Sequence, residues 1–223
     1  MLGYSKISMI FVEIMRVFRV PGFIQRWFYE MTWRIPQREK CLYLTFDDGP
    51  HPSVTLSILD ILRKFNVSAT FFCVGQNIEK YPEVIEDIIS NGHSLGNHTF
   101  NHLKGWKTPN ATYFENIDQA KALFDNHGGT TLFRPPYGRI RRSQARYLLQ
   151  QGYKIIMWHI LSYDYDSSID IDYCTQKIIK KSRNGSIVVF HDSLKSENQV
   201  LKMLPSYIES MQKKGFTFKL LPQ

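Results

Sequence analysis

The chain reads Cys41-Leu42-Tyr43-Leu44-Thr45-Phe46-Asp47-Asp48-Gly49-Pro50 at the point that decides its fold: an apolar run, two carboxylates and a turn. Gly tolerates positive φ, Pro fixes φ and Asp bonds to its own backbone, so a tight turn is expected directly after a strand. Parallel α/β folds place their sites at the carboxyl ends of strands. Asp47 and Asp48 are therefore candidate site residues, one for binding a metal and the other for handling protons.

Other short runs of β-branched and aromatic residues indicate further strands. The clear ones are 69–74, 154–158, 186–190 and 216–220, and weaker ones are 94–97 and 132–134. Near-continuous apolar strands are typical of a parallel sheet. Helical apolar spacing at 54–62, 84–89 and 117–124 separates them, so strand and helix alternate. About seven strands are too many for one small flat sheet, so we expect an α/β fold of the irregular (β/α) barrel type.

Polar residues follow three of these strands. His98 and His102 stand four apart, a spacing that predicts two rings on one side of a helical turn. Arg134 ends the weak strand 132–134, and His191 directly follows the run 186–190. Each feature alone is commonplace, for example a surface histidine pair or a charge at a strand end. Their coincidence at predicted carboxyl ends of strands indicates a divalent-metal site with acid–base groups.

Four segments, in this order, resemble the polysaccharide deacetylase family, the NodB-like carbohydrate esterases of family 4. They are Thr45-Phe46-Asp47-Asp48-Gly49-Pro50, His98-Thr99-Phe100-Asn101-His102, Arg134-Pro135-Pro136-Tyr137 and Val189-Phe190-His191-Asp192. The resemblance spans roughly residues 41–221 and implies the NodB-type distorted (β/α) barrel and a metal-dependent hydrolase.

The resemblance also implies roles for residues of the metal and acid–base groups. Asp48, His98 and His102 match the metal ligands, for which zinc is the natural choice and cobalt or nickel is also accepted. Asp47 matches the general base and Arg134 the residue that holds this carboxylate ionised and oriented.

His191 matches the general acid, and Asp164 could orient it and raise its pKa. The family's motif around Asp164 is usually richer in carboxylates, so this assignment departs from the pattern. His159, in the same stretch, is either an extra titratable group near the pocket or a polar strand residue.

Four residues are expected on the substrate side. The backbone N–H of Tyr137, which follows Pro135 in the same turn, resembles an oxyanion donor. Val189 falls where the family often has Leu and is expected to line an acetyl-methyl pocket, with Trp158 as a wall.

Removal of acetyl groups from N-acetylglucosamine units is the function that this resemblance implies, on peptidoglycan, chitooligosaccharide or another bacterial polysaccharide. The alternatives are deformylation or deacetylation of a lipid-linked aminosugar or small N-acyl metabolite, and O-acetyl ester cleavage on xylan. A sugar-binding module without catalysis is disfavoured because Asp47 and His191 accompany the metal ligands. The sequence leaves the glycan and the oligomeric state open.

Composition predicts a chain with one large core. Its 223 residues contain no linker or repeat, and its three cysteines form no disulfide framework. The net charge of +8 raises the question of nucleic acid, but the basic residues are dispersed and no nucleic-acid motif occurs, so we expect no nucleic-acid partner.

Residues 1–40 are expected to form a helical and aromatic segment before a deacetylase domain at 41–223. Apolar residues recur at helical spacing from Ile7 to Phe18, but Glu13 and Arg16 interrupt them, so neither a cleavable signal nor a transmembrane helix is expected. Aromatic residues then alternate with arginines up to Arg38. This segment either covers the barrel or makes peripheral membrane contact, and a cytoplasmic or membrane-associated, cell-envelope location is left open.

Overall fold

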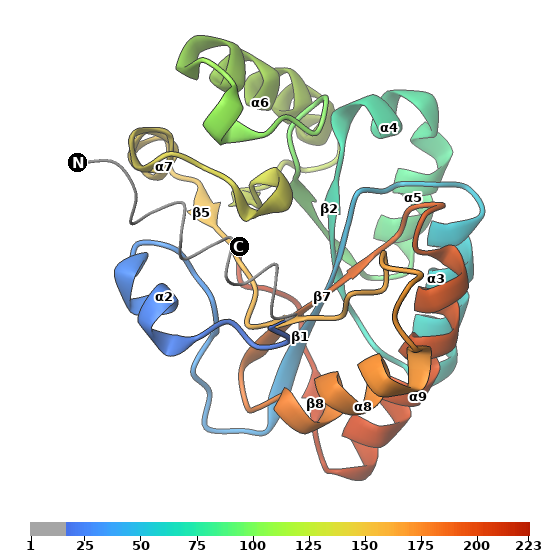
Figure 1. Cartoon of the computed structure of the whole chain (residues 1–223). Helices are drawn as coiled ribbons and strands as arrows, with labels where there is room; N and C mark the ends of the chain where they lie inside the picture. Colours follow the sequence, from blue (N-terminus) through green and yellow to red (C-terminus); the bar gives the residue numbers. More distant parts are fainter. Residues whose placement is uncertain (1–16) are drawn as a thin grey trace.

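Strand β1 (Cys41–Asp47) lies at the centre of the computed structural model, which describes residues 17–223. It pairs in parallel with β2, β7 and β8 (Figure 1). The eight-stranded sheet has the order β5-β4-β3-β2-β1-β7-β6, and β8 pairs with β1 outside this order. The irregular (β/α) barrel predicted from sequence is confirmed. The other strands are β2 (Thr70–Cys73), β3 (Ser94–Asn97), β4 (Leu132–Phe133), β5 (Lys154–Ile155), β6 (Ile160–Leu161), β7 (Ser186–His191) and β8 (Thr217–Phe218).

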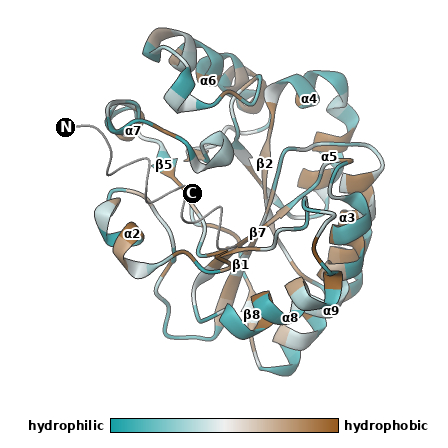
Figure 2. Cartoon of the chain, viewed as in Figure 1, coloured by the Kyte–Doolittle hydropathy of each residue, from teal (hydrophilic) through white to brown (hydrophobic). Residues whose placement is uncertain are grey.

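Helices pack around the outside of the sheet because each has one apolar face. In α3 (Val54–Phe65), Val54, Ile58 and Leu62 recur at helical spacing and are fully buried. Figure 2 shows hydrophobic faces turned towards the sheet and hydrophilic faces turned outward. The remaining helices are α2 (Gly22–Trp27), α4 (Gly75–Lys80), α5 (Pro82–Ser90), α6 (Asn110–Asp125), α7 (Arg142–Gln150), α8 (Ile171–Lys181) and α9 (Glu197–Lys213), with 3-10 turns η1 (Gly105–Lys107) and η2 (Pro136–Gly138).

The register of β1 against β7 determines which side chains face the barrel interior. Asp47 pairs with His191 and Thr45 with Val189, and successive side chains of a strand alternate between the two faces. Leu44, Phe46, Val188 and Phe190 belong to the large core shared with the outer helices. Tyr43 and Ile187, which also pair, belong to a separate interior cluster. Asp47 and His191 therefore end the interior row at the mouth of the barrel.

Strands β5 and β6 are not bonded to each other, and the chain before β1 lies between them. Arg19 forms an antiparallel bridge with Ile160, and Thr32 forms a parallel bridge with Ile156. The Thr32 N–H donates to the Ile155 carbonyl at 2.8 Å, and the Val20 N–H donates to the His159 carbonyl at 3.0 Å. Residues 17–36 thus supply backbone hydrogen-bond partners to the free edges of β5 and β6. The apolar spacing that begins at Ile7 lies mostly outside the described residues.

Two predicted elements differ from the structure. The run 154–158 is not one strand: β5 ends at Ile155, and a separate β6 begins at Ile160. Between them the Met157 N–H donates to the Thr32 carbonyl and the His159 carbonyl accepts from Val20, so residues 17–36 interrupt the pairing of β5 with β6. The stretch from His98 to His102 is a loop, so the expected helical turn is wrong. Within residues 17–223, no helix has the length and apolar character needed to cross a bilayer.

Candidate active site

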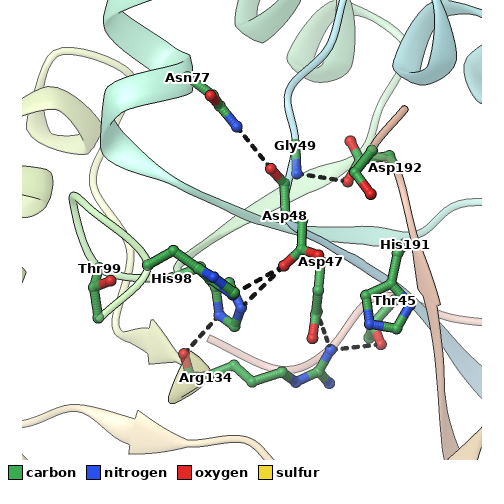
Figure 3. Close-up of polar contacts among 12 residues, drawn as sticks. Thr45, Asp47, Asp48, Gly49, Asn77, His98, Thr99, Arg134, His191 and Asp192 are labelled. Carbon is green, nitrogen blue, oxygen red and sulfur yellow. Dashed lines mark hydrogen bonds and ion pairs between the residues drawn. The ribbon is translucent and has the colours of Figure 1, made fainter. Parts of the chain in front are cut away.

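Asp48, His98 and His102 converge at the carboxyl ends of β1 and β3. The Oδ1 atom of Asp48 lies 3.6 Å from His98 Nε2 and 3.1 Å from His102 Nε2, and one donor atom from each residue falls within 4.8 Å of the others (Figure 3). Burial acts to raise the pKa of Asp48, but hydrogen bonds from both histidines outweigh it and hold this pKa well below its usual value. One carboxylate and two imidazoles are therefore gathered at one point.

The loop from His98 to His102 brings both rings to Asp48 without a helix. Thr99 and His102 have φ of 64° and 56°, which turn the backbone back sharply. Asn97 Oδ1 accepts the Thr99 N–H at 2.8 Å, and the Asn116 side chain of α6 accepts the Phe100 N–H at 3.0 Å. Loop geometry held by these amides replaces the helical spacing that the sequence suggested.

A hydrogen bond fixes the orientation of His98. Its Nδ1 lies 2.7 Å from the carbonyl oxygen of Arg134, so this nitrogen carries the proton and donates it. The Nε2 atom is then the lone-pair nitrogen, and it points to Asp48. Such a second bond is what orients a metal-binding histidine.

Asp47 is buried beside Arg134, the largest fully buried side chain among residues 17–223. Arg134 Nη1 donates to Asp47 Oδ1 at 2.5 Å and to Thr45 Oγ1 at 2.9 Å. Its remaining nitrogens donate to the carbonyls of Ile156 and Met157, and its guanidinium lies 4.1 Å from the centre of the Phe72 ring. One oxygen of Asp47 is therefore held in place by a guanidinium that stays protonated.

His191 is paired with Asp164 on the other side of the site. Its Nδ1 lies 2.7 Å from Asp164 Oδ1, and its backbone N–H donates to Oδ2 of the same carboxylate at 2.7 Å. Ser162 donates to Asp164 at 2.7 Å. Burial acts to lower the pKa of His191, but the charge and hydrogen bond of Asp164 overcome this effect and raise the pKa to about 9. The imidazole is therefore protonated at neutral pH.

The turn after β1 is held by Asp192, which directly follows His191. Asp192 accepts the Gly49 N–H at 2.9 Å and the Thr55 hydroxyl at 2.7 Å. A Cβ atom at Gly49 would lie 1.9 Å from Asp192 Oδ2, so only glycine fits there. Burial raises the pKa of Asp192 to about 7, although both hydrogen bonds act against this rise.

The residues expected on the substrate side surround the same opening. Tyr137 has a φ of 59° and is half exposed, with its ring 4.6 Å from that of His102. Pro135 is buried and accepts the Gly138 N–H, and Trp158 packs against Gly138. Val189 is buried in the interior row next to Thr45. The structure therefore groups Tyr137, Pro135 and Trp158 around one turn, with Val189 deeper.

His159 lies apart from this group. Its Nδ1 is 2.7 Å from Ser186 Oγ, at the amino end of β7, whereas His191 ends the same strand. Five residues of a β-strand span about 16 Å. Of the two interpretations left open from sequence, the structure favours a polar residue away from the catalytic pocket.

Sequence reasoning missed several positioning residues. Thr45, Asn116 and Asp192 each contact a candidate catalytic or metal-binding segment, and Asn77 donates to the Asp48 carbonyl at 2.7 Å. Of these four residues, only Asp192 could have been singled out from the sequence, because it directly follows His191. The others contact their partners across segments far apart in the chain.

Titratable side chains gathered at the carboxyl ends of barrel strands lie where α/β-barrel enzymes place their active sites. The chain belongs to the polysaccharide deacetylase family, whose sequence model matches residues 34–156. The resemblance seen in the four motifs is thereby confirmed, and the chain is a hydrolase of this family.

Relatives with 30% sequence identity align with most of the chain. A peptidoglycan-N-acetylglucosamine deacetylase of Bacillus cereus is 30% identical over 84% of this chain and 89% of its own length. A chitooligosaccharide deacetylase of Azorhizobium caulinodans is 30% identical over 85% of this chain and 96% of its own length. Among solved structures, the Bc1960 peptidoglycan N-acetylglucosamine deacetylase in complex with 4-naphthalen-1-yl-N-oxidanyl-benzamide superposes with a TM-score of 0.84. The two sequences are 30% identical, and the superposition covers 91% of this chain and 96% of the Bc1960 chain.

Proposed function

We propose that this protein removes acetyl groups from N-acetylglucosamine units of peptidoglycan or a related glycan, with a divalent metal, most simply Zn²⁺, in its site. The observation that carries the proposal is the placement of two paired acid–base groups, Asp47 with Arg134 and His191 with Asp164, at one site with Asp48 and the two histidines. The named relatives that act on peptidoglycan and chitooligosaccharide support this substrate class.

The three candidate ligands fit a metal ion. Tetrahedral zinc with N and O ligands at about 2.0–2.2 Å places its ligands about 3.3–3.6 Å apart. Asp48 Oδ1 lies 3.1 Å and 3.6 Å from the two Nε2 atoms, which matches. An ion held by Asp48, His98 and His102 would polarise the acetamide carbonyl and make water a better nucleophile.

Asp47 is the proposed general base. Its Oδ1 atom is occupied by Arg134, so its other oxygen is the one available to accept a proton from the attacking water. The guanidinium remains charged throughout, and therefore it keeps the carboxylate in place as protons move.

His191 is the proposed general acid. Departure of the sugar amine requires a proton, because an amide anion is a very poor leaving group. Nδ1 is held by Asp164, so Nε2 is the atom that would deliver the proton. With a pKa near 9 the ring holds this proton at neutral pH. The backbone N–H of Tyr137 is proposed to stabilise the oxyanion, and Val189 and Trp158 to enclose the acetyl methyl group.

Acetate release across a substrate panel tests the proposal. The panel contains peptidoglycan, chitooligomers of increasing length, acetylxylan and N-acetylglucosamine, each with and without a chelator. We expect chelator-sensitive release from the glycans that rises with chain length, because distant sugar units supply binding energy used in the transition state. Equal rates on monomer and pentamer would favour a small N-acyl substrate or a lipid-linked aminosugar, and release from acetylxylan alone would favour an ester substrate.

A further inference from the structure

The surface around α2 combines exposed aromatic rings with arginines. Phe23, Trp27 and Tyr29 are 65%, 64% and 79% exposed, although all three lie within or next to α2. On the other side of the same segment, Ile24 and Met31 are buried in a core cluster. Single exposed apolar residues are ordinary, but three large rings within seven residues form a patch.

This patch is held rigidly by its buried side. Residues before and after α2 bond to the edges of β5 and β6, as described above, and Trp33 Nε1 donates to the Phe28 carbonyl at 3.0 Å. The Arg142 side chain of α7 donates to the Trp27 carbonyl at 3.3 Å and lies 6.0 Å from the centre of its ring. The exposure of these rings is therefore a property of the folded barrel.

A cationic cavity lies beside the patch. Its volume is about 720 Å³, and it is lined by Arg19, Arg26, Arg34, Arg183 and His159, together with Tyr29 of the patch. No carboxylate lines it, and within residues 17–223 none of these four arginines forms an ion pair. Burial and then the charges of Arg34, Arg19 and Arg183 lower the pKa of His159 to about 4. Positive potential is thus concentrated in the cavity without a counterion from the described part of the chain.

The cavity and the catalytic mouth lie at different ends of the same strand. Arg183 precedes β7 and His159 contacts its first residue, Ser186, whereas His191 is its last residue. Five residues of strand separate the two ends by about 16 Å. A ligand in the cavity would therefore lie at the opposite end of β7 from His191.

We propose that the α2 surface, formed by Phe23, Trp27, Tyr29 and the arginine-lined cavity, binds the surface of an anionic phospholipid membrane. Arginine forks match phosphate oxygens, and aromatic rings favour the boundary between headgroups and acyl chains. A single-stranded nucleic acid also combines phosphate with stacking bases, but its binders use a charged groove that follows the backbone. Here the cations are gathered in one cavity, and the exposed rings belong to the same segment, with Tyr29 on the cavity wall.

Vesicle co-sedimentation of the full chain tests this proposal. The vesicles contain phosphatidylcholine with phosphatidylglycerol, or phosphatidylcholine alone, and binding is measured at rising salt. We expect binding to the anionic vesicles that weakens with salt. Each cation near an anionic surface contributes a factor of about five, so Arg19→Gln/Arg34→Gln/Arg183→Gln is expected to lose about a hundredfold in affinity. Phe23→Ser/Trp27→Ser/Tyr29→Ser is expected to show no vesicle binding even at high lipid concentration.

A matched control removes the same charge elsewhere. Lys64→Gln/Lys80→Gln/Lys202→Gln changes exposed lysines of α3, α4 and α9 and is expected to bind nearly as the parent does. Thermal midpoints confirm that each variant folds, so the test does not depend on enzymatic activity. All variants keep residues 1–16, and equal binding by all of them would overturn the proposal. Absence of vesicle binding by the parent, or tighter binding of a single-stranded oligonucleotide at the same salt, would also overturn it.

Discussion

At the residue scale, two buried carboxylates of the site, Asp47 and Asp164, are each paired with a cation, and the two cations differ in one property. Arg134 cannot lose its proton, so its pairing with Asp47 only fixes and orients the Asp47 carboxylate. His191 can lose its proton, so its pairing with Asp164 tunes the pKa of the proposed proton donor. The same kind of contact therefore serves two different purposes within one site.

Substitutions should separate metal binding from acid–base chemistry. Asp48→Ala and His98→Ala remove a proposed ligand and are expected to abolish retention of the metal, measured as bound zinc after gel filtration. Asp47→Asn and His191→Ala are expected to retain it while kcat falls on the order of a hundredfold or more, because these groups act in the transition state. Near-normal turnover in His191→Ala with metal bound would remove it as the proton donor.

The pairing of His191 with Asp164 should affect the pH dependence of kcat. His191 must be protonated to donate, so kcat falls as pH rises through the pKa of this group. Asp164 raises that pKa, and Asp164→Asn removes the charge that does so. The alkaline limb of the profile is therefore expected to move to lower pH by about one to three units. An unmoved alkaline limb would show that another group limits the reaction there.

At the scale of the element, the loop after β3 is shaped by an α6 side chain. Asn116 Oδ1 accepts the N–H groups of both Phe100 and Asn101 at 3.0 Å, and its Nδ2 donates back to Asn101 Oδ1 at 2.7 Å. These bonds take up backbone groups that a helix would have paired internally. An amide on a neighbouring helix thus joins that of Asn97 in holding the loop that carries both histidines.

Asn116→Ala is expected to loosen this loop. Metal affinity, measured by competition with a chromophoric chelator, should fall on the order of ten- to a hundredfold, since residues that orient ligands contribute this much. Gln119→Ala, at an exposed position of the same helix, is the control and should change neither affinity nor stability. Loss of stability with unchanged metal affinity would mean that Asn116 supports the helix and not the loop.

At the scale of the whole molecule, the barrel is completed by chain from outside its own βα repeats. Residues 17–36 lie between β5 and β6, and Val20, Ile24, Met31 and Trp33 pack with side chains of α6, α7 and β5. The same segment turns Phe23, Trp27 and Tyr29 outward. One short stretch therefore closes the sheet with one face and presents a patch with the other.

Two tryptophans of this stretch should respond differently. Trp33→Ala removes a buried side chain and is expected to lower the free energy of unfolding by about 3–5 kcal/mol. Trp27→Ala removes an exposed ring beside Arg142 and should cost less than about 1 kcal/mol. Chemical denaturation measures both. Equal costs would mean that the segment packs on the barrel differently from the contacts described here.

The sequence by itself determined the alternation of strands and helices and the strand ends that carry Asp47, Arg134 and His191. These features depend on apolar periodicity and turn chemistry, which are local properties of the chain. The motifs that identified the family are local for the same reason, since each lies within a few residues of one strand end.

Only the tertiary structure decided how the parts meet. The sheet order places β7 beside β1, and the register sets His191 opposite Asp47. The loop at His98 takes its form from Asn116, and the arginine-lined cavity joins residues near positions 19, 34 and 183. Such contacts join segments far apart in the chain, and their geometry depends on the packing of the whole barrel, so no local pattern in the sequence contains it.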